Sequence, residues 1–137
     1  MQQQLVSSVL SDLNSSSVDI TASAVISSDG LPIASMLQGN IDPDRVGAMS
    51  AALLALGNRT TKELLCGELE QVIVKGTDGY ILLIQAGEDT VLVVTARESA
   101  KLGLILLDAR RAARSIVDLE SSQTPLRYAM SAARQAT

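Results

Sequence analysis

Hydrophobic residues near the start of the chain recur first with a helical period and then with the period of a strand. The helical stripe lies within residues 2–14 and consists of Leu5, Val6, Val9, Leu10 and Leu13. Residues 18–27 alternate instead, and their apolar side consists of Val18, Ile20, Ala22, Ala24 and Ile26. The pattern predicts an N-terminal helix followed by a strand with one buried face and one largely polar face.

A turn and a returning strand follow directly. Asp29-Gly30 is typical of a hairpin, because both residue types tolerate the positive φ of a tight turn. Residues 31–37 form the predicted second strand of this hairpin. Pro32 cannot donate a hydrogen bond to a neighbouring strand, so we expect this strand at an edge of the sheet.

The middle of the chain carries the best-marked helix. Asp42 is a typical N-cap, and Pro43 fits the first helical position. Asp44 adds a negative charge at the positive end of the helix dipole. Gly67 is a typical C-terminal stop. Between these signals we expect a helix of about six turns.

The second half of the chain predicts three strands, at residues 69–75, 80–85 and 90–95. The last of these is almost entirely apolar, which favours a central place in the sheet. A second long helix is predicted over residues 99–119, with a stripe of Leu102, Ile105, Leu106, Ala109, Ala113, Ile116 and Val117. The order α-β-β-α-β-β-β-α predicts an α+β domain at residues 1–120, built on a five-stranded antiparallel sheet. Residues 121–137 are predicted as a polar tail, in which Pro125 interrupts the pattern and residues 126–136 form a short helix.

The middle helix has two apolar faces. Its large side chains are expected to cover the sheet, and they are Val46, Met49, Leu53, Leu56 and Leu64. Nearly opposite lies a second face that consists of Gly47, Ala48, Ala51, Leu54, Ala55 and Leu65. Small residues permit close approach of another helix, and no spare helix is evident in the chain. We therefore predict that the same helix of a second copy packs on this face. The alternative is that alanine merely favours helix on an exposed surface.

Two polar lanes remain on the middle helix. One consists of Arg45, Arg59 and Glu63, and the other of Ser50 and Thr61. If paired helices form an outer platform, these lanes are what an incoming partner meets. A solvated face is the alternative for each of these residues.

Composition and charge narrow the class of partner. The net charge is −4, and the eleven basic residues are scattered apart from Arg110, Arg111 and Arg114. Nucleic-acid binding relies on clustered Lys and Arg, so nucleic acid is not an expected partner. The chain has no Phe, no Trp and two Tyr, and therefore offers no aromatic platform for bases or flat cofactors.

The chain lacks the residues of common catalytic and metal sites. It contains no histidine, which excludes a Ser-His-Asp triad, a histidine general base and a histidine metal ligand. Cys66 ends an apolar helical run, where we expect a small buried hydrophobe. Glu68 and Glu70 alternate with apolar residues on a predicted strand, which favours a solvent face over a carboxylate active site. We expect a non-enzymatic protein with no catalytic residues, metal or cofactor.

The same features predict a cytoplasmic protein. No stretch reaches the roughly 18 apolar residues that a membrane span needs. The N-terminus lacks the basic start and apolar block of a signal peptide. The one cysteine cannot form an internal disulfide, which is typical of a reducing compartment.

Four segments of the chain resemble the Roadblock family of dynein-light-chain-related proteins. They are AVISSDGLPIA at residues 24–34, GELEQVIV at 67–74, GTDGYILL at 76–83 and SAKLGL at 99–104. The resemblance covers about residues 4–119 and implies a Roadblock/profilin-like layered fold with the element order given above.

The resemblance also implies a dimer. Roadblock proteins dimerise through the long middle helix and the strand after it, so that two sheets join into one. Residues 69–75 would then be the second edge strand, and pairing would protect that edge from aggregation. The interface predicted for this chain consists of Gly47, Ala48, Ala51, Leu54, Ala55, Asn58, Leu65, Leu69, Gln71 and Ile73.

Bacterial and archaeal members of the family similar to this chain partner small Ras-like GTPases. The resemblance therefore implies a non-enzymatic dimeric regulator that binds the switch region of such a GTPase in a nucleotide-dependent way. The alternative is a structural adaptor in a signalling or motor assembly that does not sense nucleotide. The sequence has no P-loop motif, so it does not bind nucleotide by that route itself. Arg45, Arg59 and Glu63 are the predicted GTPase contacts, with either arginine available as an arginine finger.

Overall fold

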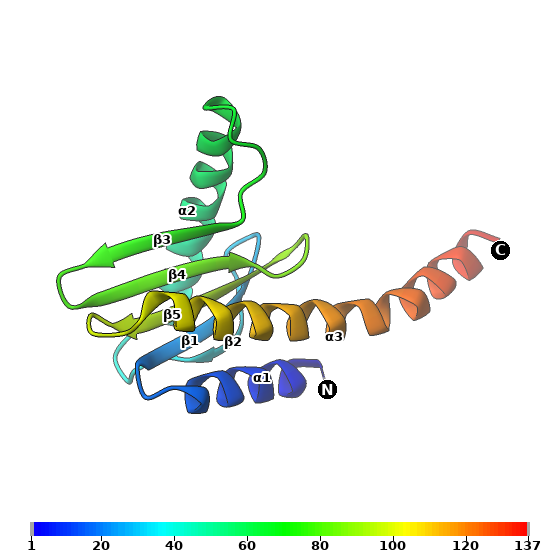
Figure 1. Cartoon of the computed structure of the whole chain (residues 1–137). Helices are drawn as coiled ribbons and strands as arrows, with labels where there is room; N and C mark the ends of the chain where they lie inside the picture. Colours follow the sequence, from blue (N-terminus) through cyan, green and yellow to red (C-terminus); the bar gives the residue numbers. More distant parts are fainter. Residues whose placement is uncertain (1, 137) are drawn as a thin grey trace.

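The eight predicted elements are present in the predicted order in a computed structural model of the chain (Figure 1). The structure describes the backbone of residues 2–136 and the side chains of residues 3–120. The elements are α1 (Gln2–Ser16), β1 (Ile20–Ser27), β2 (Pro32–Met36), α2 (Pro43–Glu63), β3 (Gln71–Gly76), β4 (Gly79–Gln85), β5 (Thr90–Arg97) and α3 (Leu102–Ala136).

The five strands form one antiparallel sheet in the order β2-β1-β5-β4-β3. This confirms that the strand with Pro32 lies at an edge and that the apolar run of β5 lies in the centre. It also places β3 at the second edge. The hairpin turn between β1 and β2 closes through a hydrogen bond from the Gly30 amide to the Ser27 carbonyl, and Gly30 has a φ of 87°.

One face of the sheet is covered by α1 and α3 (Figure 1). Their predicted apolar stripes meet there, with Leu10 of α1 and Ile116 of α3 fully buried. The strands contribute the side chains of Val25, Leu82, Leu92 and Val94 to the same cluster. This layer is closed within the chain and provides most of its core.

The other face is covered by α2, and this second layer corrects the expectation for β1. All five residues from Ala22 to Ile26 are buried, so β1 has no polar face. Ala24 and Ile26 face the α2 side, in one cluster with Val93 of β5. The Ser23 hydroxyl is satisfied by donating to Asn14 Oδ1 of α1 at 2.7 Å. A strand next to the centre of a sheet with helices on both sides is buried throughout.

The packing of α2 also differs from the expectation. Its two fully buried residues are Gly47 and Ser50, whereas Met49, Leu53 and Leu56 are exposed. A Cβ added at Gly47 would lie 2.2 Å from the Gly30 carbonyl oxygen, and one at Gly57 would lie 3.2 Å from Val72 Cγ2. The prediction that the large side chains cover the sheet holds for Val46, which packs with the α2-side cluster, and is wrong for Met49, Leu53, Leu56 and Leu64. Small residues bring α2 close to the sheet at Gly47 and Gly57.

The ends of two helices depart from the sequence prediction. The helix α2 ends at Glu63, and the chain reverses at Leu65, whose φ of 59° is left-handed, before it reaches Gly67. Cys66 is exposed, so the prediction of a buried thiol is wrong: it follows the end of a helix that no longer contacts the sheet.

The helix α3 does not stop at residue 119. It continues through Pro125 to Ala136, and its C-terminal part extends beyond the sheet and changes direction (Figure 1). Proline removes one helical hydrogen bond and bends a helix without always ending it. The division of the chain into a domain at 1–120 and a tail at 121–137 stays a prediction.

The contact between Gly47 and the hairpin gives a direct test of this packing. Gly47→Ala should lower the free energy of unfolding by about 1–3 kcal/mol, because the new methyl group overlaps a backbone carbonyl. Gly103→Ala is the matched control: this helical glycine has no neighbour within 4 Å, and alanine there should stabilise the fold by about 0.5–1 kcal/mol. Urea unfolding at equal protein concentration measures both, and equal effects would contradict the close approach of α2.

Candidate protein-interaction surface

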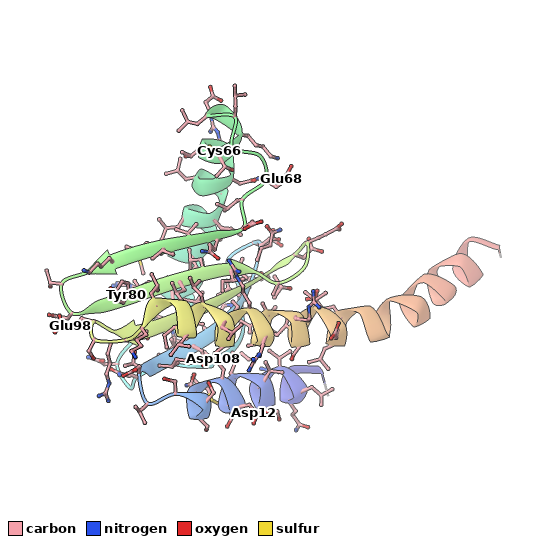
Figure 2. All side chains as sticks on the ribbon, viewed as in Figure 1. Asp12, Cys66, Glu68, Tyr80, Glu98 and Asp108 are labelled. Carbon is pink, nitrogen blue, oxygen red and sulfur yellow. The ribbon has the colours of Figure 1, made fainter. Side chains whose placement is uncertain are left out.

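The C-terminal half of α2 projects past the edge of the sheet. Figure 1 shows the helix crossing behind the strands and continuing beyond β3, and Figure 2 places Cys66 and Glu68 at this projecting end. Leu56, Leu64 and Leu65 are 62%, 69% and 93% exposed. This helix end has three exposed leucines and no sheet beneath it, and an exposed apolar surface of this kind is typical of a protein-interaction site.

An apolar flank on α2 leads to a bare part of the sheet. Met49, Leu53 and Leu56 lie on one side of the helix, at offsets of four and seven residues, and all are exposed. Val74 of β3 and Ile81 of β4 are cross-strand partners, and both are more than one-third exposed. Strand alternation puts them on the face that α2 covers, because Val72, two residues from Val74, packs with the α2-side cluster. The α2 layer therefore leaves the end of the sheet near the β3–β4 turn uncovered.

Strand β3 presents a free edge. It pairs with β4 alone, so one row of its backbone groups has no strand partner. The side chains on its α3 side are held in place: Arg110 Nη2 of α3 donates to Gln71 Oε1 at 2.8 Å, and Lys75 Nζ lies 5.7 Å from the centre of the Tyr80 ring. Ile73 between them is 40% exposed. The edge is thus straight, ordered and partly apolar, which favours pairing with another strand.

The residues predicted for a dimer interface divide into three groups. Ala48, Ala55, Leu65 and Ile73 are exposed, and Ala51, Asn58, Leu69 and Gln71 are half-buried. Gly47 and Leu54 instead contact this chain's own hairpin and α2-side core. The exposed group is distributed over α2, the turn after it and the α3 side of β3.

The hydrophobic pattern of α2 placed Met49, Leu53 and Leu56 on the wrong face, and no local pattern marks Val74 and Ile81 as exposed. A usable signal was present in the helix itself. Gly47, Ser50 and Gly57 follow one side of α2 at offsets of three and ten residues from Gly47, and a lane of small residues is typical of close packing.

The polar lane Arg45, Arg59 and Glu63 is exposed along its whole length. These residues lie on the side of α2 away from the sheet. The second predicted lane is not available to a partner, because Ser50 is buried and Thr61 is half-buried, with its hydroxyl donating to the Asn58 carbonyl at 3.1 Å.

The two glutamates considered as catalytic carboxylates precede β3 and are exposed. Glu68 Oε2 lies 3.7 Å from Lys62 Nζ, and both side chains of this ion pair are exposed to solvent. Among the residues whose side chains the structure describes, no three His, Cys, Asp or Glu residues are grouped so that they could hold a metal ion. In the same part of the chain, no helix has the length and apolar character required to cross a membrane.

Solved structures with the same fold define the class of this domain. The MglB protein of Myxococcus xanthus has a TM-score of 0.81 and 21% identity, covering 88% of this chain and 90% of that one. The gliding protein MglB of Thermus thermophilus has a TM-score of 0.79 and 18% identity, covering 88% and 92%. Profilin II of Acanthamoeba castellanii has a TM-score of 0.59 and 16% identity, covering 80% and 94%. The chain therefore has the Roadblock/profilin-like fold.

Comparison at the level of sequence identifies the family. Residues 7–96 match the family model of the Roadblock/LC7 domain. An uncharacterized protein of Methanocaldococcus jannaschii is 39% identical over 116 residues, which cover 85% of this chain and 97% of that protein. A second uncharacterized protein of the same organism is 40% identical over 112 residues, covering 82% and 96%. The chain belongs to the Roadblock/LC7 family.

Proposed function

We propose that this protein is a cytoplasmic, non-enzymatic dimer that regulates a small Ras-like GTPase by binding its switch region differently in the GTP and GDP states. The main observation behind the proposal is that α2 leaves part of its sheet face uncovered next to the free edge of β3, in a chain of the Roadblock/LC7 family. A second copy completes that layer, and the completed dimer offers an outer platform to the GTPase.

The dimer forms about a two-fold axis at the edge of β3. Antiparallel pairing of the two β3 strands joins the sheets, and the projecting end of each α2 then lies over the other copy's sheet. The bare surface at Val74 and Ile81 lies on the α2 side of the sheet, where the partner's helix arrives. A two-fold axis makes each contact occur twice.

The energetics support this arrangement. Burial of a leucine side chain contributes about 1.5–3 kcal/mol, and Leu56 and Leu64 are each more than half exposed in a single copy. Leu65 is held in a left-handed conformation that costs about 1–2 kcal/mol. The helix end itself retains this conformation, because the turn lets the Cys66 amide donate to the Thr61 carbonyl at 2.7 Å.

The interface we propose keeps the exposed and half-buried residues predicted from the sequence. They are Ala48, Ala51, Ala55, Asn58, Leu65, Leu69, Gln71 and Ile73. To these the proposal adds Met49, Leu53, Leu56, Leu64, Val74 and Ile81. Gly47 and Leu54 have a supporting role, because they fix the position of α2 on its own sheet.

The GTPase binds across the outer sides of the paired α2 helices. Arg45, Arg59 and Glu63 are exposed there in a single copy, and the proposal leaves them accessible in the dimer. The regulator acts by preferring one arrangement of the switch segments, which shifts the GTPase population toward it. In this mechanism the arginines contribute binding and are not donated as arginine fingers.

The dimer interface is tested by Leu56→Glu. A buried charge without a partner should abolish the α2 contact, so that the mass from light scattering on a sizing column falls by half. Leu104→Glu on α3 is the matched control, since Leu104 is 58% exposed and lies outside the interface; its mass should not change. A mass that Leu56→Glu leaves unaltered would remove the basis of the dimer.

Nucleotide dependence is tested by binding to a small Ras-like GTPase from the same source. The GTPase is loaded in turn with GDP and with a non-hydrolysable GTP analogue, and the dissociation constants are measured by calorimetry. We expect at least tenfold tighter binding of one state, equivalent to about 1.4 kcal/mol. Equal binding of both states would instead identify an adaptor that does not sense nucleotide.

The contact residues are tested by Arg45→Glu combined with Arg59→Glu. The double variant should weaken binding at least tenfold, whereas Arg114→Glu on α3 should not. Arg59→Lys separates the two roles for arginine. It should preserve both binding and the rate of hydrolysis, whereas loss of a true arginine finger lowers the rate by about 10³-fold or more.

A further inference from the structure

A groove lies at the opposite side of the molecule from the β3 edge. It has a volume of about 860 Å³ and opens between the first turns of α1, the β1–β2 hairpin, the β4–β5 turn and the middle of α3. Six apolar residues line it: Val6, Val25 and Ile116 are buried in the core beneath, and Pro32, Ile33 and Val117 are half-buried. An open hollow with partly exposed apolar side chains and polar surroundings is suited to an amphipathic protein segment.

The rim of the groove is acidic. Glu88 and Asp89 in the β4–β5 turn line it and are exposed. Glu120 of α3 lines it as well and is fixed in place, because the Thr90 hydroxyl donates to Glu120 Oε1 at 2.5 Å. The turn itself closes tightly on this carboxylate: a Cβ added at Gly87 would lie 2.8 Å from Glu120 Oε2. Gln3 is the polar residue that α1 contributes to the lining.

The helix α3 continues past this rim without support from the sheet. Beyond Glu120 it runs on to Ala136, and Figure 1 shows this part extending away from the rest of the domain. The extension continues a helix that is already formed, and most helical stability in proteins comes from packing of an apolar face. A surface on which the extension packs would therefore stabilise it.

The sequence of the extension complements the groove. Leu126, Ala129, Met130 and Ala133 recur at offsets of three, four and seven residues, which is the apolar stripe of an amphipathic helix. The charged residues of segment 121–136 are Arg127 and Arg134, both basic. An apolar stripe beside two arginines matches a partly apolar groove with three carboxylates on its rim.

We propose that residues 126–133 of α3 dock in this groove on a second copy of the chain. A continuous helix cannot return to a groove lined by its own preceding turn, so the helical extension reaches only another molecule's groove. When two copies exchange their extensions in this way, their α3 helices run antiparallel. The two-fold axis that relates the copies then passes near residue 124. Residues 126–133 of one copy then lie opposite residues 122–115 of the other, which includes the groove-lining Ile116, Val117 and Glu120.

This contact is separate from the α2 and β3 interface and does not rest on GTPase binding. A chain with two different two-fold interfaces joins its dimers into a tetramer or a longer array. The groove thus gives the proposed regulator a way to assemble into larger clusters.

The test uses the full chain with Cys66→Ser, so that each added cysteine is the only one. Glu88→Cys at the groove rim is mixed with chains carrying Ala129→Cys on the stripe, under mild oxidation. The 88–129 disulfide can form only between molecules. We expect at least tenfold more of it than with Ser131→Cys, which lies off the stripe and is the matched control. Mass spectrometry of the linked peptides identifies the pair.

Two further variants decide between occupants of the groove. Leu126→Asp combined with Met130→Asp should abolish the cross-link, whereas Ser131→Asp with Gln135→Asp, both off the stripe and away from the axis, should leave it intact. Equal cross-linking of the Ala129 and Ser131 positions would overturn docking of the stripe. A chain carrying both Glu88→Cys and Ala129→Cys that links only within itself at high dilution and at high concentration would show that the segment folds back, and would overturn the second copy as occupant.

Discussion

A sheet with apolar side chains on both faces must be covered on both, and this requirement governs the whole molecule. The α1–α3 layer meets it within the chain, with Leu10 and Ile116 fully buried between helices and strands. On the other face, the contact of Gly47 with the Gly30 carbonyl fixes where α2 crosses the hairpin. A helix anchored at its first turns in this way runs off the sheet at β3 and leaves Val74 and Ile81 bare. We propose that a second copy completes the layer, and Roadblock/LC7 membership supports this proposal.

Most of the fold could be predicted from local patterns. The N-cap at Asp42, the type and order of the elements and the exclusion of Pro32 from a central strand depend on near neighbours in the chain, and each was confirmed. The predictions that failed depend on packing between elements that are distant in the sequence. The alternation in β1 predicted a polar face, but Ser23 is buried because helices cover both sides of the sheet. Pro125 predicted a break, yet α3 continues through it.

The candidate site was harder to predict because α2 carries two apolar stripes, and hydrophobicity alone does not say which one faces the sheet. Side-chain size gave the wrong face, because a large residue such as Leu56 was expected in the core. The face toward the sheet instead contains Gly47, whose backbone lies close to the hairpin. The exposed lane with Arg45 and Arg59 could be found, since charges on a long helix rarely face a core. The groove on the other side of the molecule combines five elements distant in the chain, and no sequence window contains it.

The central claim is that a second copy closes the α2 layer at β3, and amide hydrogen exchange measures this most directly. The two edge strands serve as an internal comparison. The β3 amides that point away from β4 should exchange at least tenfold more slowly than the outward-pointing amides of β2, and dilution should remove the difference. Rapid exchange at both edges, at every protein concentration, would mean that β3 is an open edge and would contradict the account.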